Sequence, residues 1–130
     1  MDSIFFQETK SSPAIAFDSG TGLLEISGES YPENSYEFYK PLLLWISRFC
    51  TIFPGTIVFS CRITYLNTGS TKSMMDIFDL FEDRFQRGQE IKVNWFCDID
   101  NDRAIETAEE FMEDVTFPFE IKPLVRADEL

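Results

Sequence analysis

The chain has 130 residues, of which 44% are hydrophobic and 15% aromatic, so it is long and apolar enough to fold as one domain around a single core. Eleven lysines and arginines face twenty-three acidic residues, a net charge of −12, which predicts that the chain binds neither nucleic acid nor an anionic membrane. The sequence contains no histidine, which excludes Ser-His-Asp and Cys-His catalytic groups and histidine-ligated zinc.

Cellular location and cysteine chemistry follow from what else the sequence lacks. No apolar run reaches the length of about eighteen residues that marks a membrane span. The start, MDSIFFQETKSS, lacks the basic region of a signal peptide, so we expect a cytoplasmic protein. Cys50, Cys61 and Cys97 are far apart and form no CxxC pair, which predicts three reduced, buried thiols. We expect one domain over residues 1–130, with residues 1–12 flexible and residues 124–130 as a tail.

The first half of the chain predicts a hairpin and then a helix. Apolar runs at 13–18 and 22–28 flank the turn-forming sequence DSGTG and predict two antiparallel strands. Residues 34–53 carry an apolar stripe at helical spacing: Phe38, Leu42, Trp45, Ile46 and Phe49. Because proline disrupts a helix interior, Pro41 predicts either a kink or a short first helix before the main one.

The second half alternates strands with helices. Strict alternation predicts strands at 56–67 and 90–97, and a short strand follows at 117–124. Helical stripes predict helices from about Met74 to Phe85, ended by Gly88, and over 102–115. The order β-β-α-β-α-β-α-β predicts a single small α/β domain with a mixed sheet and amphipathic helices that cover one sheet face more than the other. Small antisigma-factor-antagonist (STAS-like) domains have this layout.

The most unusual segment is YLNTGSTKSM, residues 65–74, which joins a predicted strand to a predicted helix. Ser70 or Thr71 could serve as the helix N-cap, which needs only one such residue. The surplus hydroxyls suggest phosphorylation, because a phosphate at a helix N-terminus meets free backbone N–H groups. Lys72 could pair with such a phosphate.

Two further segments each allow two interpretations. SYPENSYEFY, residues 30–39, is either an aromatic protein interface or a helix start whose aromatic residues belong to the core. DIDNDRAIETAE, residues 98–109, resembles a calcium-binding EF-hand loop through Asp98, Asp100, Asp102 and Glu109. However, Arg103 occupies the position that needs glycine, and a strand precedes the loop in place of a helix. An acidic helix start is the simpler interpretation, and a small calcium-responsive domain is the alternative.

Five stretches resemble one protein family: SPAIAFD, GLLEISGESYPENSYEFYKPLLLWI, RITYLNTGSTKSMMDIFDLFED, VNWFCDIDND and AEEFMEDVTFPFEI. They cover nearly the whole chain in order, and the combination of SYPEN with YLNT is specific. In these stretches the chain resembles the SiaC family of bacterial regulatory phosphoproteins.

This resemblance implies a signalling protein that is not an enzyme and has no cofactor. In the family, a dedicated kinase phosphorylates the threonine of the YLNT motif, and a PP2C-type phosphatase removes the phosphate. The unphosphorylated form binds and activates a diguanylate cyclase, which raises cyclic diguanylate and promotes aggregation or biofilm formation.

Carried over to this sequence, the resemblance implies Thr68 as the phosphoacceptor, with Ser70 and Thr71 as weaker alternatives. Serine often follows this threonine in the family, whereas this chain has Gly69, which is expected to loosen the helix start. The implied partner-binding residues are Tyr31, Pro32, Glu33, Asn34, Asn67, Gly69, Ser70 and Lys72.

Overall fold

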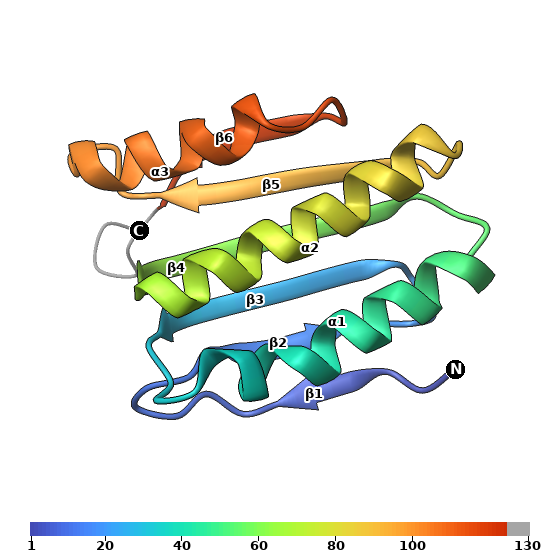
Figure 1. Ribbon diagram of the computed structural model, residues 1–130, viewed down its shortest axis with the longest axis horizontal. Helices are drawn as coiled ribbons and strands as arrows, with labels where there is room; N and C mark the ends of the chain where they lie inside the picture. The colour runs from blue at the N-terminus through green and yellow to red at the C-terminus, as the bar shows by residue number, and fades with distance from the viewer. Residues whose placement is uncertain (125–130) are drawn as a thin grey trace.

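A six-stranded mixed sheet carries three helices on one of its faces (Figure 1). This computed structural model describes residues 1–124, so the predicted tail lies outside the described residues except for Leu124. The strands are β1 (Ile4–Phe6), β2 (Ala14–Phe17), β3 (Leu23–Ser30), β4 (Ile57–Leu66), β5 (Ile91–Cys97) and β6 (Phe119–Pro123). The helices are α1 (Ser35–Ile52), α2 (Thr68–Gln86) and α3 (Asp102–Glu113).

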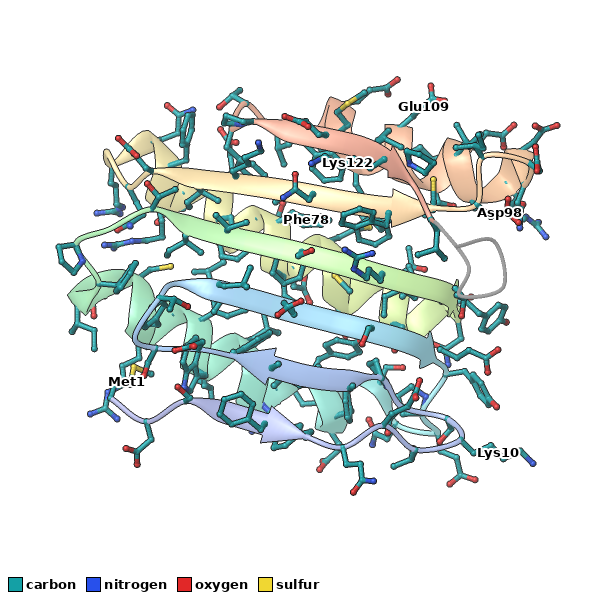
Figure 2. The ribbon with its side chains drawn as sticks, turned by 180° about the vertical axis from the view of Figure 1, so that it is seen from behind. Met1, Lys10, Phe78, Asp98, Glu109 and Lys122 are labelled. Atoms are coloured by element: carbon teal, nitrogen blue, oxygen red, sulfur yellow. The ribbon has the colours of Figure 1, made fainter. Side chains whose placement is uncertain are left out.

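The strands lie side by side in the order of the chain. β1, β2 and β3 pair antiparallel, which confirms the predicted hairpin between β2 and β3, whereas β3 to β6 run parallel. Each parallel step is bridged by one helix, and right-handed crossovers that all advance in one direction place their helices on the same sheet face. The opposite face, turned toward the viewer in Figure 2, carries no helix among the described residues. The predicted mixed α/β sheet is therefore confirmed.

Two predictions about the first half of the chain are wrong. Residues 1–12 were expected to be flexible, but β1 lies within them and pairs with β2, with Ile4 opposite Phe17. A strand of three residues is too short to show alternation, so the sequence gives no periodic signal for it. Of the two alternatives at Pro41, the short first helix is wrong, because α1 continues through the proline, and the kink stays a prediction. Tyr39 and Leu42 on either side of the proline are fully buried, and this packing offsets the lost hydrogen bond.

The core lies between the helices and the covered sheet face. Alternate residues of β5 are buried, as its period predicts. The helices contribute buried aromatic side chains, among them Tyr39, Trp45, Phe49, Phe78, Phe81 and Phe111. The three cysteines are free and buried, as predicted, and burial raises the pKa of the Cys50 thiol to about 11. Across the described residues, no helix combines the length and apolarity that a bilayer crossing needs.

Candidate functional site

The carboxyl ends of the parallel strands β3, β4 and β5 meet at one edge of the sheet, where all three helices begin (Figure 1). At this edge the YLNT segment leaves β4 and enters α2. Asn67 is the N-cap of α2, since its Oδ1 accepts a hydrogen bond of 2.8 Å from the Ser70 N–H. The prediction that Ser70 or Thr71 caps the helix is therefore wrong. Both residues already lie inside the first turn, whereas an N-cap must be the last residue with extended backbone, as Asn67 is.

Ser70 instead belongs to a buried hydroxyl network that joins three elements. Its Oγ lies 2.8 Å from Ser30 Oγ at the end of β3, and Ser30 Oγ lies 2.6 Å from the Tyr39 hydroxyl of α1. Ser35 Oγ, at the start of α1, lies 3.3 Å from Asn67 Oδ1 and 3.4 Å from Ser70 Oγ. Since buried polar groups need partners, these hydroxyls lock the ends of β3, α1 and α2 together. One of the hydroxyl residues in 65–74, Ser70, thus has a structural role.

The SYPEN and YLNT segments, predicted as separate candidates, form one surface. The Asn67 N–H donates to the Ser30 carbonyl at 3.0 Å, and its side-chain Nδ2 donates to the Pro32 carbonyl at 3.4 Å. The Tyr31 and Tyr65 rings meet edge to face at 5.9 Å. We call this surface, made by Tyr31, Pro32, Glu33, Asn34, Tyr65, Asn67, Thr68 and Gly69, the switch face.

Not every predicted contact residue is available on the switch face. Asn34 and Asn67 are helix caps, and the Asn34 side chain accepts from the Glu37 N–H at 3.1 Å. Ser70 is 0% exposed, which argues against it as a partner contact or a phosphoacceptor. Tyr65 is 54% exposed and was missed, because in the sequence it is one more alternating residue of a strand.

Gly69 fits this corner because it has no side chain. A Cβ atom there would lie 2.7 Å from Ser35 Oγ and 2.9 Å from Ser35 Cβ. These distances are shorter than van der Waals contact, so any larger residue would push α1 and α2 apart at their starts. Gly69 thus allows the N-termini of α1 and α2 to approach closely. The sequence suggested only that this glycine would loosen the start of the helix.

Two hollows flank the start of α2. The first, with a volume of about 370 Å³, lies between α2 and α3 and is lined by residues that include Thr68, Thr71, Asn101, Arg103 and Thr107. The second, of about 380 Å³, lies between α1 and α2 and is lined by residues that include Glu33, Tyr36, Gly69, Lys72 and Asp76. We call them the α2–α3 pocket and the α1–α2 pocket.

Thr68 is an exposed side chain at the first residue of α2, and it lines only the α2–α3 pocket. Lys72 faces the other side, where its Nζ lies 3.7 Å from Asp76 Oδ1. The described lining of the α2–α3 pocket contains neither Asp nor Glu. The polar members of this lining are neutral side chains and one arginine, Arg103.

The acidic segment 98–109 is a helix start. Asn101 caps α3, accepting from the Arg103 and Ala104 N–H groups, and α3 begins at Asp102. Asp98 accepts from the Asp100 N–H at 3.0 Å, while Glu109 lies well along α3 and apart from Asp98 in Figure 2. Within residues 1–124 no three acidic or cysteine side chains are grouped to hold a metal. The geometry therefore contradicts the alternative calcium site at Asp98, Asp100, Asp102 and Glu109.

The buried phenol of Tyr39 gives the hydroxyl network a measurable property. Burial raises the pKa of Tyr39 from 10.0 to about 12, and the hydrogen bond from Ser30 partly opposes this shift. The unfolded chain loses this proton near pH 10, so between about pH 10 and 12 it binds fewer protons than the folded chain. The free energy of unfolding must therefore fall as the pH rises through this interval.

We expect Tyr39 ionisation to remove about 2 kcal/mol of stability by pH 12. Tyr39→Phe removes the phenol, so it should cost about 1 kcal/mol at pH 7 through the lost hydrogen bond and then lose less stability on alkalinisation. Urea unfolding of both proteins from pH 7 to 11.5 measures the difference. Ionisation of the cysteines affects both proteins equally and so does not contribute to it. Equal losses in the two proteins would show that Tyr39 is not the titrating group.

Comparison with known proteins identifies the family. Residues 6–124 match the sequence model described as SiaC family regulatory phosphoprotein. A protein of Pseudomonas aeruginosa strain UCBPP-PA14 is 43% identical over 122 residues, which cover 94% of this chain and 97% of that protein.

Solved structures agree. SiaC of P. aeruginosa superposes with a TM-score of 0.89 at 41% identity, covering 95% of this chain and 100% of that one. A structure of diguanylate cyclase SiaD in complex with its activator SiaC, also from P. aeruginosa, gives a TM-score of 0.89 at 42% identity, covering 93% of this chain and 99% of the matched chain. The chain therefore belongs to the SiaC family of regulatory phosphoproteins.

Proposed function

We propose that this chain is a non-enzymatic regulator that activates a diguanylate cyclase and releases it when Thr68 is phosphorylated. The relative co-crystallised with a cyclase as its activator supports the choice of partner. The observation that carries the proposal is the position of Thr68, an exposed hydroxyl at the start of α2 on the switch face. Cyclic diguanylate output, and with it biofilm or aggregation control, would then depend on one side chain.

The phosphoryl group would be placed and removed by partner enzymes. A protein kinase would join Thr68 Oγ1 to the γ-phosphorus of ATP, breaking the bond to the β–γ bridging oxygen and releasing ADP, while the hydroxyl proton passes to the kinase. A PP2C-type phosphatase would direct water at the phosphorus, releasing inorganic phosphate and returning a proton to Thr68. This chain supplies only the acceptor, and the ATP requirement makes the cytoplasm the proposed location.

Access favours Thr68 over its neighbours as the acceptor. Ser70 is fully buried in the hydroxyl network, so a kinase would have to unfold the corner to reach it. Thr71 is half-buried, and its Oγ1 donates to the Asn67 carbonyl at 3.0 Å. A Thr68 hydroxyl with open access requires no such disruption.

The direct test is to locate phosphate on protein purified from its own host, before and after phosphatase treatment. Intact mass and tandem fragmentation should find a single removable phosphate on Thr68, about 80 Da, and none in a Thr68→Ala variant. Phosphate on Ser70 or Thr71 alone, or none under any growth condition, would contradict the assignment.

A further inference from the structure

The pocket that Thr68 lines also carries a cation of the same chain, Arg103. We infer that Arg103, at the start of α3, binds the phosphate on Thr68 across the α2–α3 pocket and acts as its intramolecular counter-ion. This inference rests on the proposed function, because it concerns the phosphorylated form of the same site.

The first argument is placement. Thr68 and Arg103 come from different helices, yet both line the α2–α3 pocket. Figure 1 shows the reason, since α2 and α3 start at the same sheet edge, after the adjacent strands β4 and β5. A phosphate attached to Thr68 Oγ1 would therefore lie at a pocket that Arg103 also lines. The pocket volume of about 370 Å³ leaves room for it.

The second argument is charge. Arg103 is the one formally charged residue in the described lining of the α2–α3 pocket. It is exposed, and among residues 1–124 it forms no ion pair, so its guanidinium is available. A guanidinium binds phosphate oxygens through two parallel hydrogen bonds, a geometry that other side chains do not provide. In a chain with a net charge of −12, Arg103 is thus a cation that shares a pocket with the acceptor hydroxyl.

The third argument concerns the neutral groups of the pocket. Asn101 places an amide on the same lining, and its Nδ2 can donate a hydrogen bond to a phosphate oxygen, whereas the Thr71 and Thr107 hydroxyls already donate to backbone carbonyls. The Thr68 and Gly69 N–H groups belong to the first turn of α2, where no intrahelical acceptor exists. The pocket thus combines one cation with neutral donors around a single acceptor hydroxyl.

The geometry disfavours Lys72, the cation that the sequence suggested for this role. Lys72 lines the α1–α2 pocket, whereas Thr68 lines only the α2–α3 pocket. Lys72 also pairs with Asp76, and Glu33 lines the same hollow. A phosphate directed toward Lys72 would therefore enter a region that already contains two carboxylates.

The test uses full-length protein carrying phosphothreonine at position 68, introduced during translation so that no kinase is needed. A phosphorus-31 NMR titration reports the second pKa of the phosphate, ordinarily near 6. A bound guanidinium stabilises the dianion, so this pKa should be lower by about one unit in the native chain than in Arg103→Gln. Arg103→Lys, which keeps the charge, should retain part of the shift.

Two matched variants serve as controls. Arg87→Gln removes an exposed arginine that is paired with Asp83 at the far end of α2, and Lys72→Gln removes the competing cation. Both should leave the phosphate pKa unchanged. An equal phosphate pKa in the native chain and in Arg103→Gln, or a rise in Lys72→Gln alone, would overturn the assignment of Arg103. If Arg103→Gln melted at a lower temperature before phosphorylation, the phosphate pKa of Arg103→Lys would still test the assignment. Lysine keeps the charge but cannot form the two parallel hydrogen bonds of arginine.

The same phosphorylated protein separates this inference from the proposed function. If it binds the cyclase as tightly as the unphosphorylated chain, the proposed function fails, whatever the NMR titration shows. If it loses the cyclase while Arg103→Gln leaves the phosphate pKa unchanged, only the role of Arg103 fails.

Discussion

Thr68→Asp is expected to weaken binding of the diguanylate cyclase by at least about a hundredfold, because partner binding would remove water from the added negative charge. The side chain lies on the switch face and is exposed in the free chain, so partner binding would desolvate it. A phosphate carries up to two negative charges, so about one remains when Arg103 offsets the other. Inverting a 99:1 ratio of bound to free protein takes about 10⁴-fold in affinity, or about 5.5 kcal/mol. Calorimetric titration with purified cyclase measures the loss, and cyclase activity should fall in parallel.

A neutral substitution should behave differently. Thr68→Ala removes the acceptor but adds no charge, so it should bind within about threefold of the native chain and remain active when the kinase is present. Its hydroxyl has no partner among the hydrogen bonds described for residues 1–124, whereas that of Thr71 does. If Thr68→Ala lost the cyclase, the hydroxyl itself would be a binding group and the charge mechanism would be incomplete.

Misfolding would not explain the expected loss in Thr68→Asp. Position 68 is the first residue of α2, where a carboxylate interacts favourably with the helix dipole, so the variant should be as stable as the native chain or slightly more so. The matched control is Thr21→Asp, which adds the same charge in the exposed β2–β3 turn, at the opposite edge of the sheet. It should bind the cyclase normally. Native-like binding by Thr68→Asp would refute the charge mechanism.

The elements whose apolar pattern repeats over many residues could be predicted from the sequence, and the structure confirms them. The β4 sequence has an apolar residue at every second position from Ile57 to Tyr65, and α2 carries five apolar residues on one side. Neither pattern has a competing interpretation. β1 could not be predicted this way, because a three-residue strand is held by pairing with β2 and has no period of its own. The resemblance to STAS-like domains stays a prediction.

The site was harder to predict because it depends on contacts between segments far apart in the chain. Asn67, Ser70 and Thr71 are all acceptable caps by residue type. Asn67 is the cap because it is the last residue with extended backbone before α2 begins. The union of SYPEN with YLNT follows from the parallel register of β3 and β4, which sets Ser30 beside Leu66. Arg103 was noticed only as a misfit in a calcium loop. The rule that adjacent parallel strands end at one edge could have placed it near Thr68.

The switch face also depends on the core, through α2. Phe78 lies nearly three turns beyond the start of this helix and is 2% exposed. Figure 2 labels it behind the strands, on the side of the sheet that the helices cover. Its ring lies 5.2 Å from Phe111 of α3, 5.5 Å from Phe119 of β6 and 5.9 Å from Phe59 of β4. One side chain thus connects α2 to two strands and to the helix that carries Arg103.

Phe78→Ala should lower the free energy of unfolding by about 3–5 kcal/mol, through lost burial and the cavity that remains. Since domains of this size are stable by only about 5–15 kcal/mol, this loss would be a large fraction of the total stability. Urea unfolding measures this, with the denaturant dependence unchanged if the transition stays two-state. Phe5→Ala is the control, since Phe5 is 69% exposed and its loss should cost no more than about 0.5 kcal/mol. A cost below about 1 kcal/mol for Phe78→Ala would mean that α2 does not depend on this cluster, and that the hydroxyl network alone holds Thr68 in place.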